Sequence, residues 1–240
     1  MRIDQNLTGD FAIIIPVYNH GATLRGVVEA ASELGLPVFV VDDGSTDGGA
    51  HTIEHMPGVQ LIRHQTNQGK GAALITGFQA AAAQQMQWAI TLDADGQHNP
   101  DDARVLMDAI APGQRPIVVG CRQQMLDQGA PWTSRFGRGF SNFWVYMAGG
   151  PSVADSQSGF RIYPLPEVLH LGVRARRYQF EIEVLVKAAR HQIPVCEAPI
   201  SVIYPPGSQR VSHFRPFVDF LRNSYTFTRL ITQRVFSRFN

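Results

Sequence analysis

Cysteine is scarce in this chain of 240 residues, and long hydrophobic runs are absent. The two cysteines, Cys121 and Cys196, lie far apart in apolar stretches, which argues against a disulfide framework and against a cysteine-based zinc site. No stretch reaches the roughly 20 apolar residues that span a bilayer, and the first ten residues lack the apolar region of a signal peptide. We therefore expect a soluble protein of the cytoplasm.

An excess of charge of either sign is also missing. Lysine and arginine total 21 and aspartate and glutamate total 20, which gives a formal net charge of +1 at pH 7. This balance provides no global attraction to nucleic acid, so no nucleic-acid partner is expected. With 44% hydrophobic residues, the chain is apolar enough and long enough to bury a large core.

What the sequence does contain is a regular alternation of two patterns in its first half. Near-continuous apolar runs, typical of strands buried on both faces of a parallel sheet, occupy residues 11–15, 38–41, 59–62, 88–92 and 117–120. Between them, the apolar residues of 24–34 and of 74–82 recur at the spacing of one helix face. The alternation predicts a doubly wound α/β sheet, which binds ligands at the carboxyl ends of its strands.

The second half is less regular, with helices predicted over 134–147 and 178–191. We expect one domain over residues 1–212, extended by a basic amphipathic helix over 213–240. One side of this helix is apolar, and the opposite side carries Arg215, Arg222 and Arg229. The apolar side consists of Phe217, Phe220, Leu221, Phe227, Ile231 and Val235. Such a helix either packs on its own domain or lies at a membrane surface, and both readings stay open.

Polar clusters follow three of the predicted strands, and the densest is DADGQHNP after the fourth. Asp93 and Asp95 stand one residue apart, and Gln97 follows two residues later. Because Asp and Gly are ordinary turn residues, the motif alone is compatible with a plain turn. Two carboxylates at the end of a buried strand nevertheless repel each other unless they are compensated. Hard oxygen ligands of this kind suit Mg²⁺ or Mn²⁺.

Two further clusters are compatible with a nucleotide and its phosphates. In VVDDGSTDGG, the acids either shape a turn and cap a helix, or one of them accepts a ring N–H from a nucleotide base. In NQGKGAAL, Gly69 and Gly71 flank Lys70 just before a predicted helix. Glycines permit close approach of a ligand and a helix N-terminus favours phosphate, although an ordinary loop has the same composition.

Arginines are the candidate contacts for further phosphate groups. In DSQSGFRIY, Asp155 precedes Arg161 by six residues, a spacing that a salt-bridged loop would also explain. The other candidates are Arg122, Arg135, Arg138 and Arg210.

Taken as an ordered set, the motifs resemble those of the family 2 glycosyltransferases, particularly the dolichyl- and polyprenyl-phosphate sugar synthases. The matching motifs are PVYN, VVDDGSTDG, NQGKGAAL, LDADGQ, DSQSGFR, the FEIE helix and YPPGSQR, and they span most of the chain. The resemblance implies a GT-A fold, a UDP- or GDP-sugar donor and Mg²⁺ or Mn²⁺ as cofactor. It also implies a lipid-linked acceptor. If the C-terminal helix lies at a membrane surface, the enzyme would be peripheral on the cytoplasmic face of the membrane.

The resemblance further implies roles for individual residues. Asp93, Asp95 and Gln97 would hold the metal ion, with Asp93 also close to the nucleotide. The base and ribose would be lined by Pro16, Tyr18, Asn19 and Asp43, and Lys70 would lie near the nucleotide. On the acceptor side, Arg122 and Arg138 would meet phosphate, and the loop with Asp155 and Arg161 would complete the catalytic set.

Three departures from the family pattern bear on the acceptor more than on the chemistry. His20 follows PVYN where an acid is common, the hydrophobic hairpins that anchor many relatives are absent, and RVSHFRPFVDF differs from the usual ending.

The chemistry implied is sugar transfer with inversion at the anomeric carbon. A polyprenyl phosphate needs no general base, whereas a hydroxyl of a glycan or glycolipid needs one, for which Asp155 is the candidate. The alternatives are a non-catalytic nucleotide-sugar-binding subunit and a sugar nucleotidyltransferase of the same fold.

Overall fold

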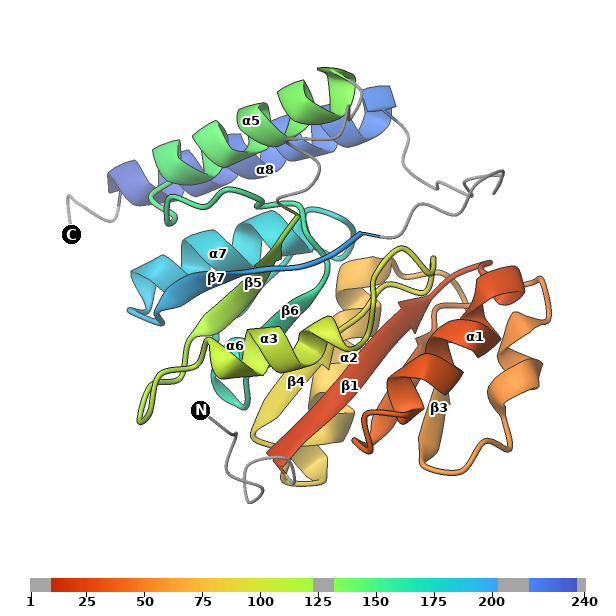
Figure 1. The fold of residues 1–240 in the computed structure, drawn as a ribbon. Coiled ribbons are helices and arrows are strands. Elements are labelled where there is room, and N and C mark those ends of the chain that lie inside the picture. Colours follow the sequence, from red (N-terminus) through yellow and green to blue (C-terminus); the bar gives the residue numbers. More distant parts are fainter. Residues whose placement is uncertain (1–9, 123–131, 203–215, 237–240) are drawn as a thin grey trace.

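A seven-stranded sheet forms the centre of the molecule (Figure 1). The structure is a computed structural model that describes residues 10–122, 132–202 and 216–236. Five strands follow the apolar runs of the sequence, and a sixth lies near the C-terminal end of the domain. They are β1 (Phe11–Val17), β2 (Val38–Asp42), β3 (Val59–Arg63), β4 (Trp88–Thr91), β5 (Ile117–Cys121) and β7 (Val195–Pro199). The predicted mixed α/β fold with a mostly parallel sheet is confirmed.

The strand order is β3-β2-β1-β4-β6-β5-β7. Strand β1 lies between β2 and β4, and its Ile13 stands opposite Val38 on one side and Ile90 on the other. These three side chains are almost completely buried. Continuous burial on both faces explains why the central strands consist of unbroken apolar runs.

Strand β6 (Arg161–Pro164) has no counterpart among the predicted elements. It runs antiparallel to both neighbours, β4 and β5, and completes the sheet between them. The strand is four residues long and begins with a fully buried arginine, so a search for apolar runs passes over it. Its first residue lies at the edge where the parallel strands end.

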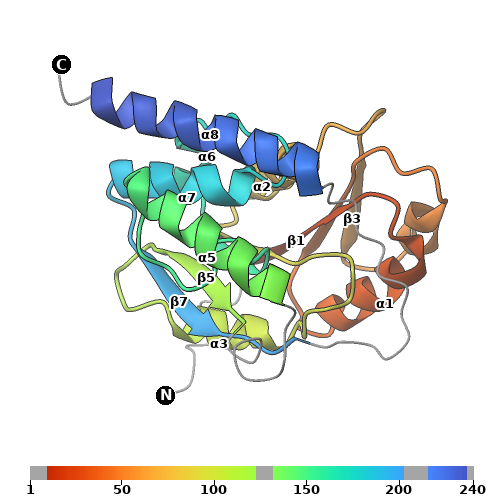
Figure 2. The same cartoon turned by 90° about the horizontal axis from the view of Figure 1, so that it is seen from above.

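Helices cover both faces of the sheet (Figures 1 and 2). One face packs on α1 (Gly21–Ser32), α3 (Asp102–Asp108) and the short 3₁₀ helix η2 (Gly49–Ile53). The other packs on α2 (Lys70–Ala83), α6 (Glu167–His170) and α7 (Phe180–Arg190). Helix α2 lies very close to β1, because a Cβ added at Gly77 would stand 2.3 Å from Cγ2 of Ile14.

Two long helices form an outer layer beyond α7. Figures 1 and 2 show α5 (Trp132–Met147) and α8 (Pro216–Phe236) lying next to each other there. Side chains are described from residue 139 in α5 and for residues 224–234 in α8. Within the described ranges, no helix combines the length and the apolar character needed to cross a bilayer.

Helix α8 packs on its own domain, which is the first of the two readings of the tail. Phe227 and Leu230 are buried in the same core cluster as residues of α5 and α7, and the Phe227 ring lies 6.1 Å from that of Trp144. Arg229, which the periodicity assigned to the polar side, donates to Glu183 of α7 at 2.5 Å. Its long side chain therefore reaches back to the domain.

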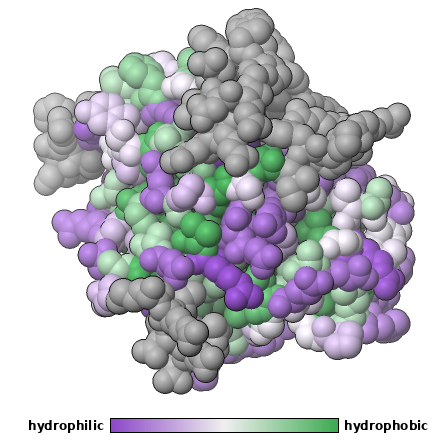
Figure 3. Space-filling model, in the orientation of Figure 1, coloured by the Kyte–Doolittle hydropathy of each residue, from purple (hydrophilic) through white to green (hydrophobic). Residues whose placement is uncertain are grey.

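The face drawn in Figure 3 carries both hydrophobic and hydrophilic residues. Hydrophobic residues gather there in small patches between hydrophilic ones.

Candidate active site

The polar motifs meet at one edge of the sheet. Strands β1, β2 and β4 are parallel neighbours, so the residues that follow Val17, Asp42 and Thr91 are brought to the same edge. Strand β5 ends at this edge with Cys121, followed by Arg122, and β6 begins there with Arg161. The expectation that ligand-binding residues gather at the carboxyl ends of the strands fits this arrangement.

Lys70 occupies the centre of the edge. It is the first residue of α2, and its Nζ lies 2.7 Å from Oδ1 of Asp93 and 2.8 Å from Oε1 of Glu181. A cation at a helix N-terminus opposes the helix dipole, so the two carboxylates are what stabilises it there. Burial by itself lowers the pKa of Lys70, but the attraction of Asp93 and Glu181 outweighs it and raises that pKa. The lysine is therefore held as an ammonium ion.

The pKa of Asp93 also shifts in the direction that favours the charged form of its side chain. Burial raises it, but the nearby Lys70, His98 and Arg122 together lower it below its ordinary value. Asp93 is consequently ionised at neutral pH. A Cβ added at Gly159 would lie 2.5 Å from Oδ2 of Asp93 and 2.7 Å from Nζ of Lys70. The SG turn of DSQSGFR thus brings bare backbone against this ion pair, which only glycine permits.

Glu181 had no assigned role in the sequence, although the FEIE motif contains it. It stands in the first turn of α7, is 4% exposed and lies between buried Phe180 and Ile182. A carboxylate inside such an apolar run is seldom buried without a cationic partner, so its position was the available signal.

Asp43 organises the loop that leads to Lys70. Its carboxylate accepts the backbone N–H groups of Gln68 at 2.8 Å and Gly69 at 2.7 Å. It also lies 2.7 Å from Nδ1 of His64, whose Nε2 is 3.0 Å from the Thr76 hydroxyl. His64 directly follows the end of β3. Since a carboxylate has about four acceptor positions, three of those of Asp43 are engaged.

Asn19, Pro16 and Tyr18, which were also predicted to line the base, lie in different surroundings from one another. Asn19 joins two loops, because its N–H donates to the Ser45 hydroxyl at 3.0 Å and its Oδ1 accepts from the Thr46 N–H at 2.8 Å. Its φ of 52° is left-handed, a conformation that Asn tolerates. Pro16 pairs with Val41 inside the sheet, and Tyr18 is half-buried beyond the end of β1.

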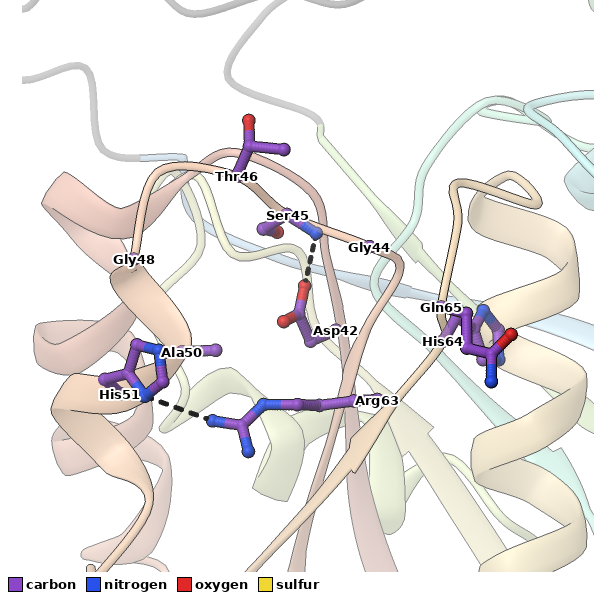
Figure 4. Close-up of a pocket in the computed structure, with 10 residues that line it drawn as sticks. All are labelled: Asp42, Gly44, Ser45, Thr46, Gly48, Ala50, His51, Arg63, His64 and Gln65. Atoms are coloured by element: carbon purple, nitrogen blue, oxygen red, sulfur yellow. Dashed lines mark hydrogen bonds between the residues drawn. The ribbon is translucent and has the colours of Figure 1, made fainter.

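A polar pocket of about 400 Å³ opens beside this group (Figure 4). Asp42 points into it and accepts the Ser45 N–H at 2.9 Å. Arg63 extends across the pocket, and its Nη2 lies 3.5 Å from Nδ1 of His51. Asp42 therefore lines this pocket, whereas the neighbouring Asp43 holds the loop of residues 67–70.

Asp95 and Gln97 form the turn that follows Asp93. Asp95 Oδ1 accepts the backbone N–H of Gln97 at 3.0 Å, and the Thr23 hydroxyl donates to the carbonyl of Ala94 at 2.6 Å. His98 is buried against the Phe160 ring, 5.4 Å away. Burial lowers the pKa of His98, and the attraction of Asp93 and Asp95 opposes that shift.

On the other side of the edge, Asp155 is fully buried and paired with Arg122. Its Oδ2 accepts from Nε at 2.6 Å and its Oδ1 from Nη2 at 2.9 Å, a bidentate arrangement. The Arg122 side chain remains 22% exposed. Asp155 thus fixes the direction of an arginine that still reaches the surface.

Arg161 is enclosed completely. It donates to the backbone carbonyls of Ser158, Glu181 and Ser156 at 2.7, 2.9 and 2.8 Å. This position suits a residue that holds the Asp155–Gly159 loop against α7. It does not suit a residue that contacts a ligand. Arg135 and Arg138 lie in the part of α5 whose side chains are outside the described residues, and Arg210 is outside them altogether.

Comparison with known proteins identifies similar chains over most of the sequence. Residues 12–163 match the family model of glycosyl transferase family 2. The chain is 32% identical over 213 residues to a UDP-N-acetylglucosamine–dolichyl-phosphate N-acetylglucosaminyltransferase of Methanococcus voltae, covering 80% of this chain and 85% of that one. It is 27% identical over 201 residues to a polyprenol monophosphomannose synthase of Mycolicibacterium smegmatis, covering 79% and 76%.

Among solved structures, the fold is similar to mannosyl-3-phosphoglycerate synthase from Rubrobacter xylanophilus. The TM-score is 0.66 at 18% identity, with 98% of this chain and 76% of that chain covered. The predicted GT-A fold is confirmed by this likeness and by the family match. The protein is a glycosyltransferase enzyme, and its chain belongs to glycosyl transferase family 2.

Proposed function

We propose that the protein transfers a sugar from a UDP- or GDP-sugar to a polyprenyl phosphate, with a divalent metal ion and inversion at the anomeric carbon. The observation that carries the acceptor assignment is the buried Asp155 paired with the partly exposed Arg122. The printed names of the two similar enzymes, which specify dolichyl-phosphate and polyprenol monophosphomannose, support the same class of acceptor.

The state of Asp155 distinguishes between two kinds of acceptor. A hydroxyl acceptor must lose its proton to a base as it attacks, whereas a phosphate oxygen is already ionised. Both Asp155 oxygens accept hydrogen bonds from Arg122, and the side chain is 0% exposed. In this position, Asp155 is badly placed to accept a proton from an acceptor hydroxyl. It is well placed to orient the planar guanidinium of Arg122, whose geometry matches phosphate oxygens.

The donor would lie at the N-terminus of α2. Lys70 provides an ammonium ion there for the diphosphate, and Glu181 holds that ion in place. Asp43 fixes the preceding loop through the Gln68 and Gly69 N–H groups and retains one acceptor position for a base N–H. We assign Lys70 to the diphosphate and Asp43 to the shape of the nucleotide site.

Asp93, Asp95 and Gln97 fit a metal ion that arrives with the diphosphate. Mg²⁺ commonly uses one or two carboxylates together with substrate phosphates. Asp93 and Asp95 are such a pair, each held by a contact to one oxygen. Among the described residues, no group of three or more His, Cys, Asp or Glu side chains forms a closed metal cage, so the protein donors alone are incomplete. When bound, such an ion would neutralise charge on the leaving diphosphate.

The experiment is transfer of a labelled sugar from a panel of UDP- and GDP-sugars to polyprenyl phosphate, with Mg²⁺ or Mn²⁺. We expect a lipid-phosphate-linked sugar of inverted anomeric configuration, and no product in excess chelator. Full turnover in chelator would contradict the metal, and retained configuration would contradict inversion. Donor binding without transfer or hydrolysis would instead indicate a non-catalytic subunit.

We further propose that the enzyme is peripheral on a membrane through its outer layer. Phe143 and Tyr146 of α5 and Tyr225 of α8 are 54%, 62% and 72% exposed, and aromatic side chains favour a membrane interface. Removing α8 would expose the core around Phe227 and Leu230, so point substitutions test this better than truncation. The triple Phe143→Ser/Tyr146→Ser/Tyr225→Ser variant should lose liposome binding while staying folded. Unchanged binding would contradict the proposal.

A further inference from the structure

A second groove, of about 480 Å³, lies between α8 and the segment that leads into α7. It shares no residue with the donor and acceptor groups described above. Its lining residues are Arg174, Ala175, Arg176, Arg177, Gln179, Tyr225, Thr226 and Arg229. Four of these eight residues are arginines, so the groove is strongly basic although the whole chain carries a formal charge of only +1.

The positive charge of the groove is only partly balanced. Arg174, Arg176 and Arg177 are exposed, and within the described part of the chain none of them is within salt-bridge distance of a carboxylate. The acid in contact with the group is Glu183, which accepts from Arg229 Nη2 at 2.5 Å and lies 3.5 Å from Lys187 Nζ. Among the described side chains, one buried carboxylate thus faces several cations.

Lys187 lies beside this group. Burial lowers its pKa, the attraction of Glu183 opposes that shift, and repulsion from Arg229 and Arg174 adds to it.

Arg229 supplies an independent sign of a missing partner. Its guanidinium is anchored at Nη2 by Glu183, yet its Nε–H is buried and has no acceptor among the described residues. A buried donor without an acceptor is unfavourable, and proteins seldom retain one without a reason. Arg229 also lines the groove, where its side chain is 21% exposed.

The wall of the groove is fixed by the fold and does not depend on a ligand. The Arg176 carbonyl accepts the N–H of Ala72 in α2 at 3.0 Å, and the Ala175 N–H donates to Glu183 at 2.9 Å. Thr226 and Gln179 are 6% and 5% exposed, whereas Tyr225 is 72% exposed at the rim. Arginine forks on a fixed wall match the oxygens of a phosphate group.

We propose that this arginine groove is a second anion site that binds a phosphate group, carried either by an anionic phospholipid or by a small soluble phosphate. The proposal does not depend on the reaction or the acceptor proposed above.

The test compares the full chain with an Arg174→Gln/Arg176→Gln variant. Arg25→Gln/Arg104→Gln is the matched control. The two arginines are 62% and 61% exposed on α1 and α3, and replacing them removes the same charge from the opposite face of the sheet. Binding is measured to phosphatidylcholine vesicles with and without phosphatidylglycerol, and to inorganic phosphate by calorimetry. Circular dichroism verifies that each variant folds.

If the ligand is a lipid headgroup, the wild type binds the phosphatidylglycerol vesicles and the groove variant binds them about tenfold or more weakly, since each arginine near an anionic surface contributes on the order of 1 kcal/mol. The control variant keeps wild-type binding. An Arg174→Lys/Arg176→Lys variant retains the charge without the fork, and it should bind with intermediate affinity.

If the ligand is a soluble phosphate, vesicles make no difference. Calorimetry then shows phosphate binding that the groove variant loses and that a Lys70→Met variant keeps. The proposal is overturned if the groove variant binds vesicles and phosphate as the wild type does. It is equally overturned if the groove and control variants weaken to the same extent, since general charge would then explain the binding.

Discussion

Replacing Asp155 by Asn gives the sharpest test of how the acceptor side works. The substitution keeps the shape of the side chain but removes the charge that receives Nε and Nη2 of Arg122 at 2.6 and 2.9 Å. Breaking a buried ion pair typically destabilises a protein by about 3–5 kcal/mol. Because the Arg122 side chain is 22% exposed and water can solvate it in part, we expect about 2–3 kcal/mol here. For a chain of this size, that loss lowers Tm by roughly 5–10 °C.

The kinetic consequence separates a positioning residue from a base. If Asp155 positions Arg122, the variant should show mainly a higher acceptor KM, with kcat reduced about tenfold or less and an unchanged pH profile. Loss of a general base would lower kcat by about 10²–10⁴-fold and remove the acid limb of the profile. Steady-state transfer measured across pH, together with thermal unfolding, distinguishes the two.

A matched control exists at the opposite edge of the sheet. Arg115 and Glu167 form a similar two-pronged pair there, with Nη2 to Oε2 at 3.0 Å. Glu167→Gln should lower Tm without changing acceptor KM. A thousandfold fall in kcat of Asp155→Asn with its acid limb lost, while Glu167→Gln stays active, would refute the positioning role.

The remaining predictions concern the Lys70 cluster. Lys70→Met should weaken binding of UDP or GDP in calorimetry by about tenfold or more, because it removes a cation at the phosphate end and leaves Asp93 and Glu181 to repel each other; unaltered affinity would exclude Lys70 from the donor site. Gly159→Ala should abolish transfer, since its Cβ would lie 2.5 Å from Asp93 Oδ2. Gly26→Ala on α1 has open space and should raise Tm slightly. Equal activity of the two variants would count against a role for the Lys70–Asp93 pair. The pKa of Asp93 is lowered and that of Lys70 raised, so their contribution to the free energy of unfolding is complete between the unfolded-state values of about 4 and about 10. It is lost as pH falls through the lowered pKa of Asp93 or rises through the raised pKa of Lys70. Urea unfolding of Lys70→Met should therefore lack the alkaline loss of stability, because the lysine that titrates there is gone.

The sequence predicted the elements that depend on simple apolar patterns. Strands β1 to β5 and helices α1, α2, α5 and α7 follow from continuous runs or from helical spacing, because burial on one or both faces requires them. Strand β6 was missed because its burial includes a charged residue, Arg161, whose partners are backbone carbonyls from distant segments. No local pattern encodes those partners.

The candidate site divides in the same way. The motifs identified Lys70, Asp93 and Asp155 as residues of interest, but not that Lys70 forms an ion pair with Glu181 or that Arg122 covers Asp155. Those pairs join residues more than 30 positions apart in the chain, so they arise only once α7 and β5 are packed. Likewise, adjacent Asp42 and Asp43 are alike in sequence, and only the structure places one at the pocket and the other on the loop.

The proposed acceptor is a phosphate, which needs no general base. The most direct measurement offers the enzyme polyprenyl phosphate and the corresponding polyprenol, of equal chain length, with the same labelled nucleotide sugar. We expect transfer to the phosphate and none to the alcohol. Equal or faster transfer to the alcohol would contradict it.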